Sequence, residues 1–197
     1  MLLITFGEII DLILMTLSVG YIFSGIIPVR REEHYDPLVH YKRGFDFEGL
    51  KFAIMATAPA IILHELAHKF VAISFGLNAV FFAFYRSSFT LILGIFTIIS
   101  KLTGFGFMFF VPGFVGISGT GTRLQFALTA FAGPFVNLIL WLIPWYLIKN
   151  KLYKKKHYLL LLLTQRINMF LFIFNMIPLP GFDGYKVFSG LIRAVIG

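Results

Sequence analysis

The chain has no cysteine and few charged residues. The absence of cysteine excludes disulfides and thiolate metal ligands. Charged residues make up 13% of the 197 residues, whereas soluble domains usually carry about a quarter. Apolar residues make up 58%, and aromatic residues 18%. This composition predicts an integral membrane protein with several spans, folded as one domain over residues 1–197.

Acidic residues are scarce as well, with 9 against 17 lysines and arginines. The resulting net charge of +8 would suggest a nucleic-acid partner for a soluble protein. Here the basic residues lie largely in short connections between apolar segments, with Lys154, Lys155 and Lys156 as the densest group. Such residues set membrane topology and contact anionic lipid headgroups. We therefore expect the lipid bilayer as a partner, and no nucleic acid.

Four apolar segments are long enough to span a bilayer, at 2–27, 50–75, 124–148 and 158–176. The first has no basic leader and no small-residue cleavage pattern, so we expect it to be a retained anchor helix. A loop with both signs of charge is predicted at 28–49. The tail 185–197 is predicted to be a short helix along the membrane.

The segment 79–123 is apolar but is interrupted by glycine, proline and serine. Residues 88–100 are too few to cross a hydrocarbon core of ~30 Å at ~1.5 Å per residue. The glycine-rich part at 104–121 is unsuited to a stable helix. Irregular backbone is tolerated inside a membrane where it lines a protein cavity. We predict a mainly α-helical polytopic bundle with a re-entrant or hairpin element here; a full span followed by an ordinary glycine-rich loop stays open.

The sequence HELAH at 64–68 places three ionisable groups in an apolar span. His64 and His68 share one helical face because they are four residues apart, and Glu65 lies beside that face. Leaving such groups unpaired in mid-bilayer costs about 2.5–3.5 kcal/mol each on insertion scales. A zinc ion pairs with both imidazoles, and with an open position it activates water. We predict one Zn²⁺ per chain, with Glu65 as the general base.

A third ligand is required, and Asp183 is the candidate left by elimination. It is the one carboxylate after Glu65, and it lies in an apolar stretch; the one later histidine, His157, lies in the lysine-rich loop. Pro178 and Pro180 forbid a continuous helix before Asp183, so its side chain can reach sideways. A simple interfacial turn residue is the alternative.

Three motifs together resemble the site-2 proteases, which are intramembrane zinc metalloproteases. They are HELAH, AGPFVN at 132–137 and NMIPLPGFDG at 175–184, and the resemblance is closest to the compact archaeal and bacterial members. It implies a catalytic core at about 50–190 and a zinc site of His64, His68 and Asp183, with Glu65 as base. It also implies that Asn175 binds the substrate backbone or the oxyanion.

The middle motif also matches the family, whereas two positions near Asp183 differ from it. Gly133, Pro134 and Asn137 match a motif with a structural role, and we interpret Asn137 as a residue of helix packing. Phe182 and Tyr185 stand where the family usually has leucine and glycine. These exchanges alter volume near the site but remove no ligand.

The expected activity is hydrolysis of peptide bonds within or near transmembrane helices of other proteins. Such a substrate must unwind locally, and the segment 104–121 could hold it extended as an added strand. The alternatives are an inactive homologue that binds membrane helices, a zinc protease with a downstream glutamate ligand, and an ion transporter. No glutamate follows Glu65, and a transporter's row of intramembrane acids is missing.

The side of the membrane that the site faces and the roles of Glu8 and Asp11 each have two interpretations. The resemblance places the site towards the cytoplasmic side of the cell membrane. The lysine-rich loop at 149–157 is expected on the side opposite to the site, so the positive-inside rule would place the site towards the outside. We follow the resemblance. Glu8 and Asp11 share one face, either as a water path or gate, or as ordinary residues near an interface. The sequence does not predict the substrate or the oligomeric state.

Overall fold

Four helices in the computed structural model are long and apolar enough to cross a membrane. The structure describes residues 3–24, 47–104 and 110–196. The four spans are α1 (Phe6–Phe23), α2 (Phe47–Ser74), α4 (Arg123–Lys149) and α5 (Tyr158–Asn175), the last joined to a preceding turn η3 (Lys155–His157). The prediction of a helical polytopic membrane protein is confirmed. Most of the loop predicted at 28–49 lies outside the described residues, and its last residues begin α2 instead.

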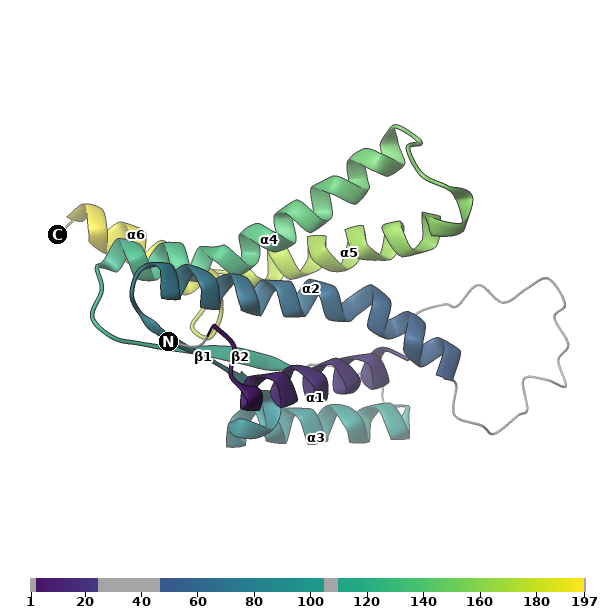
Figure 1. Cartoon of the computed structure of the whole chain (residues 1–197), viewed down its shortest axis with the longest axis horizontal. Coiled ribbons are helices and arrows are strands. Elements are labelled where there is room, and N and C mark those ends of the chain that lie inside the picture. The colour runs from purple at the N-terminus through teal and green to yellow at the C-terminus, as the bar shows by residue number, and fades with distance from the viewer. Residues whose placement is uncertain (1–2, 25–46, 105–109, 197) are drawn as a thin grey trace, which may run out of the picture.

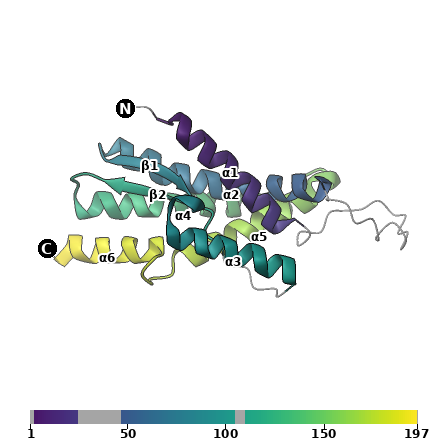
Figure 2. The ribbon, with the colours of Figure 1, turned by 90° about the horizontal axis from the view of Figure 1, so that it is seen from below.

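The helices are arranged around α2, which lies between two groups (Figure 1). On one side α4 packs against α5, and on the other α1 lies beside α3 (Ser88–Thr103). The C-terminal helix α6 (Asp183–Ile196) packs on α4 at the same end of the molecule as the start of α1, a placement that Figure 2 shows from below. This central position of α2 puts its C-terminal half within reach of α4 and of the turn before α6.

Helix packing around α2 uses small side chains. Ala53, Ala56 and Ala60 on α2 are buried, and so is Gly20 on α1, where an added Cβ would overlap the side chain of Ile54. Small residues allow close backbone approach where lipid offers no hydrophobic drive for association. Large apolar side chains instead cover much of the outer surface of the described helices. This inverted distribution is typical of a helical membrane protein.

A small sheet interrupts the helical architecture. Strand β1 (Asn78–Ala83) follows α2 directly and pairs antiparallel with β2 (Gly113–Ser118), with Asn78 opposite Ser118 and Ala83 opposite Gly113. Between the strands lie a short turn η2 (Phe84–Arg86) and α3, which has 16 residues and is not among the candidate spans. The chain therefore leaves the sheet and returns to it, as the hairpin prediction for 79–123 requires. Residues 105–109 of that segment lie outside the described part of the chain.

Candidate metal centre

Three side chains that are far apart in the sequence converge beside α2. His64 and His68 lie one helical turn apart and are buried, and their Nε2 atoms are 3.0 Å from each other. The Oδ2 atom of Asp183 lies 3.2 Å from each of these nitrogens. The structure thus brings together the two imidazoles of the HELAH motif and the carboxylate that elimination suggested.

Asp183 reaches the imidazole pair because the chain turns sharply after α5. Helix α5 ends at Asn175, and α6 begins at Asp183 itself. Gly181 in this turn has φ +100°, a conformation that favours glycine. Gly184 packs so closely on the turn that an added Cβ would lie 2.8 Å from the carbonyl oxygen of Ile177. These two glycines let the turn fold back and aim the first residue of α6 at α2.

The outer nitrogens of both imidazoles are held by α4. His68 Nδ1 lies 2.7 Å from the backbone oxygen of Thr129, which can only accept a hydrogen bond, so Nδ1 carries the proton. His64 Nδ1 lies 2.6 Å from Asn137 Oδ1. The Asn137 amide group donates to the carbonyl of Ala60 and to Asn168 Oδ1, which fixes its oxygen as the acceptor facing His64. When both rings carry only this Nδ1 proton, their Nε2 atoms present lone pairs to Asp183 and to each other.

This donor set fits a metal cation. Two neutral imidazole lone pairs and a carboxylate oxygen repel one another at these distances unless a positive charge lies among them. Tetrahedral zinc with bonds of about 2.0 Å separates its ligand atoms by about 3.3 Å, close to the observed spacing. Hydrogen bonds from the outer nitrogens to an amide and a carbonyl are the usual support for histidines that bind metal. The three residues can hold Zn²⁺ with a position left open.

Helix α4 approaches the site closely at Gly133. A Cβ placed on Gly133 would lie 2.7 Å from two ring atoms of His64 and would overlap Nε2 of His68. The hydrogen of glycine thus makes room for both imidazoles. Asn137, which we interpreted as a residue of helix packing, is more than that because it bonds His64 directly. The interpretation of Gly133 as a structural residue agrees with this contact.

Two supporting residues were missed in the sequence. Asn168 is fully buried on α5, and its amide donates to the carbonyl of Thr164 while its oxygen accepts from Asn137. A polar side chain in an apolar span was the available signal for it. Thr129 contributes its backbone oxygen, so its side chain gave no signal at all.

The remaining predicted site residues, Glu65 and Asn175, make no hydrogen bond to this cluster within the described residues. Glu65 is half-buried beside His64, and its carboxylate is within electrostatic range of Asp183 and of Lys186 on the first turn of α6. Asn175 is half-buried at the end of α5. Among the hydrogen bonds of the described residues, none involves Glu65 or Asn175 side chains. Their roles stay predictions.

Comparison with known proteins shows a similarity to a zinc metalloprotease described in an archaeon. A protein of Methanocaldococcus jannaschii described as a putative zinc metalloprotease is 33% identical over 195 residues, covering 96% of the chain and 88% of the relative. No protein-family model and no solved structure matches the chain.

The close approach of α4 at Gly133 predicts how a substitution there affects metal binding. Exchange of Gly133→Ala adds one methyl group where both imidazoles lie, so we expect metal affinity to fall by about 10- to 100-fold or more. Metal content of the purified protein, measured by mass spectrometry after equilibration with a zinc buffer, checks this. Ala132→Gly on the same helix adds no atoms and should keep the metal. Equal zinc in the Gly133→Ala variant and the wild type would contradict the geometry.

Proposed function

The chain belongs to the site-2 protease-like family of compact archaeal zinc metalloproteases, and we propose that it is an intramembrane zinc metallopeptidase. Its substrates are the transmembrane helices of other membrane proteins, cut within or near the bilayer as a step of regulated proteolysis. The observation that carries this proposal is the convergence of His64, His68 and Asp183, with Glu65 beside them, in a chain with four candidate spans.

Each residue of the site has a definite chemical task. A bound zinc ion supplies a Lewis acid that polarises a carbonyl group and lowers the pKa of water. His64 and His68 would hold the ion through Nε2, and Asp183 would hold it through Oδ2. Glu65 accepts a proton on its carboxylate from the attacking water and delivers it to the leaving amine. The Asn175 amide donates a hydrogen bond to the substrate backbone or to the developing oxyanion.

The sheet offers a place to hold an unwound substrate. The N–H of Phe84 donates to the carbonyl of Pro112. In an antiparallel pair, residues that bond the partner strand alternate with residues whose N–H and C=O groups point away from it. In this register the N–H and C=O groups of Val115 and Ile117 point away from β1. Within the described residues these groups have no hydrogen-bond partner. The opposite edge of β1 is occupied at Phe81, whose N–H donates to Glu8. We therefore assign substrate addition to the free edge of β2.

The general base provides the most direct test of the activity. Glu65→Gln removes the proton acceptor but no ligand, so we expect cleavage of a model membrane helix to fall by at least about 100-fold while bound zinc stays unchanged. Cleavage is followed by mass spectrometry in detergent or bilayers. Wild type stripped with a chelator and reloaded with zinc serves as control. Normal cleavage by the Glu65→Gln variant would favour the alternative, a homologue that binds membrane helices without cutting them.

The free edge of β2 is tested by removing one backbone donor. Val115→Pro deletes an outward N–H, and we expect cleavage to fall by about tenfold or more without loss of zinc. Val115→Thr keeps the N–H and the branched side chain, so it should cleave as wild type does. If both variants cleave equally well, the substrate does not add at this edge.

We also propose that the site faces the cytoplasm, as the family resemblance implies. The turn between α4 and α5 lies at the far end of the molecule from α6 (Figure 1), so its lysines would then face outwards, against the positive-inside trend. A cysteine introduced by Lys155→Cys is unique in this chain. A membrane-impermeant thiol reagent should label it in intact cells; labelling only after lysis would place the site on the outside.

A further inference from the structure

The carboxylate of Glu8 receives hydrogen bonds on both oxygens. Oε1 accepts from Lys69 Nζ and, at 2.8 Å, from the backbone N–H of Phe81. Oε2 accepts from the backbone N–H of Thr5 at 2.8 Å and from its hydroxyl at 3.0 Å. Glu8 is 3% exposed and Lys69 is 2% exposed. Glu8 is therefore a buried carboxylate with both oxygens paired.

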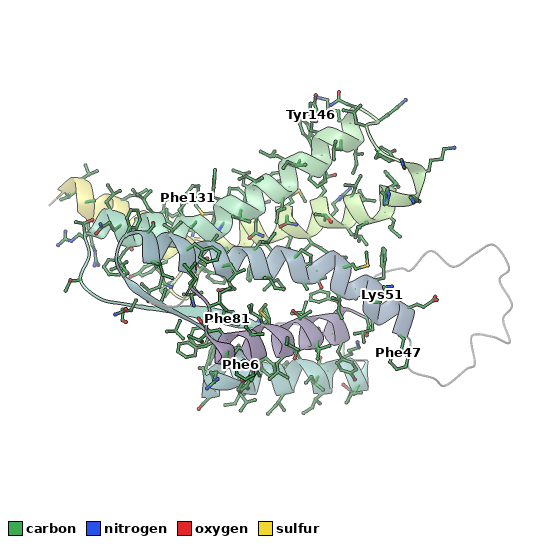
Figure 3. All side chains as sticks on the ribbon, in the orientation of Figure 1. Phe6, Phe47, Lys51, Phe81, Phe131 and Tyr146 are labelled. Atoms are coloured by element: carbon green, nitrogen blue, oxygen red, sulfur yellow. The ribbon has the colours of Figure 1, made fainter. Side chains whose placement is uncertain are left out.

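This carboxylate joins three segments next to the candidate metal centre. Lys69 follows the proposed ligand His68 on α2, and Phe81 lies within β1 opposite Val115 in the ladder. Glu8 itself closes the N-terminal capping box of α1. Figure 3 shows Phe81 between α1 and α2. The helix that carries the imidazoles, the strand that leaves it and the first span therefore meet at one group.

A second carboxylate, one helical turn further along α1, bonds the segment that follows β1. Asp11 is 1% exposed and accepts from the Tyr85 hydroxyl and, at 3.4 Å, from Arg86 Nε. Both partners lie in η2, directly after β1. A buried ion pair is no better than apolar packing for holding two helices together. What apolar packing lacks is an acceptor for an outward strand N–H, and Glu8 supplies one at Phe81.

We propose that Glu8 is a positioning residue for peptide hydrolysis. Its carboxylate fixes β1, and through the ladder β2, at a set position along α2. A substrate strand on the free edge of β2 then presents one peptide bond to the pair of imidazoles. This inference rests on the proposed function, and it assigns to Glu8 the choice of the bond that is cut and the tightness of substrate binding, not the chemical step.

Two double variants separate the role of Glu8 as a hydrogen-bond acceptor from the role of its negative charge. Both carry Lys69→Met, which avoids an unpaired buried ammonium group; one adds Glu8→Leu and the other Glu8→Gln. The glutamine oxygen can still accept from Phe81, whereas leucine cannot. For E8L/K69M we expect a KM about tenfold higher, cleavage spread over neighbouring bonds, and a kcat within about threefold of wild type. E8Q/K69M should restore the single cleavage position, and zinc content should be equal in both.

The hydrogen bond from the Phe81 amide to Glu8 can also be tested without measuring activity. Hydrogen–deuterium exchange of the purified full chain should show loss of protection at the Phe81 amide in E8L/K69M and retained protection in E8Q/K69M. Thr5→Ala, which removes the capping hydroxyl, controls for loss of the α1 cap. Wild-type cleavage by E8L/K69M, equal impairment of both variants, or unchanged exchange at Phe81 would overturn the proposal. An inactive wild type with full zinc would instead overturn the proposed function. The exchange data would still show whether Glu8 holds the Phe81 amide.

Discussion

Two hydrogen bonds at the outer edges of the imidazoles determine the rest of the site. Asn137 Oδ1 and the carbonyl of Thr129 take the Nδ1 protons of His64 and His68. When the rings carry only those protons, both Nε2 lone pairs point at the oxygen of Asp183. The arrangement is unfavourable without a cation and favourable with one. A site that suits a positive ion is thus built into the interior of a membrane protein.

This constraint explains the composition of α4. Thr129, Gly133 and Asn137 recur every four residues, so they lie on one helical face, and all three are buried. The outer two hold an imidazole each, and the glycine between them leaves space for both rings. Asn137 in turn is oriented by Ala60 and Asn168, so α2, α4 and α5 are locked in one relative position. Helix packing and ligand orientation are served by the same face.

The sequence allowed prediction of the spans, the hairpin segment and the three converging residues, because each has a signal in residue type and spacing. The HELAH spacing defines one helical face, and the scarcity of later carboxylates singles out Asp183. The supporting contacts had weaker signals. Thr129 acts through its backbone, and the direct bond of Asn137 to His64 depends on how α2 and α4 pack. The bonds of Glu8 to Lys69 and Phe81 join segments whose contact no local pattern encodes.

The ligands of the metal can be measured directly. X-ray absorption at the zinc edge, recorded on the purified protein and on an Asp183→Asn variant, reports the ligands of the metal. We expect one zinc per chain with two imidazole nitrogens and oxygen ligands at about 2.0–2.1 Å, and weaker binding in the variant. Protein without zinc after equilibration, or zinc that lacks imidazole ligands, would contradict it.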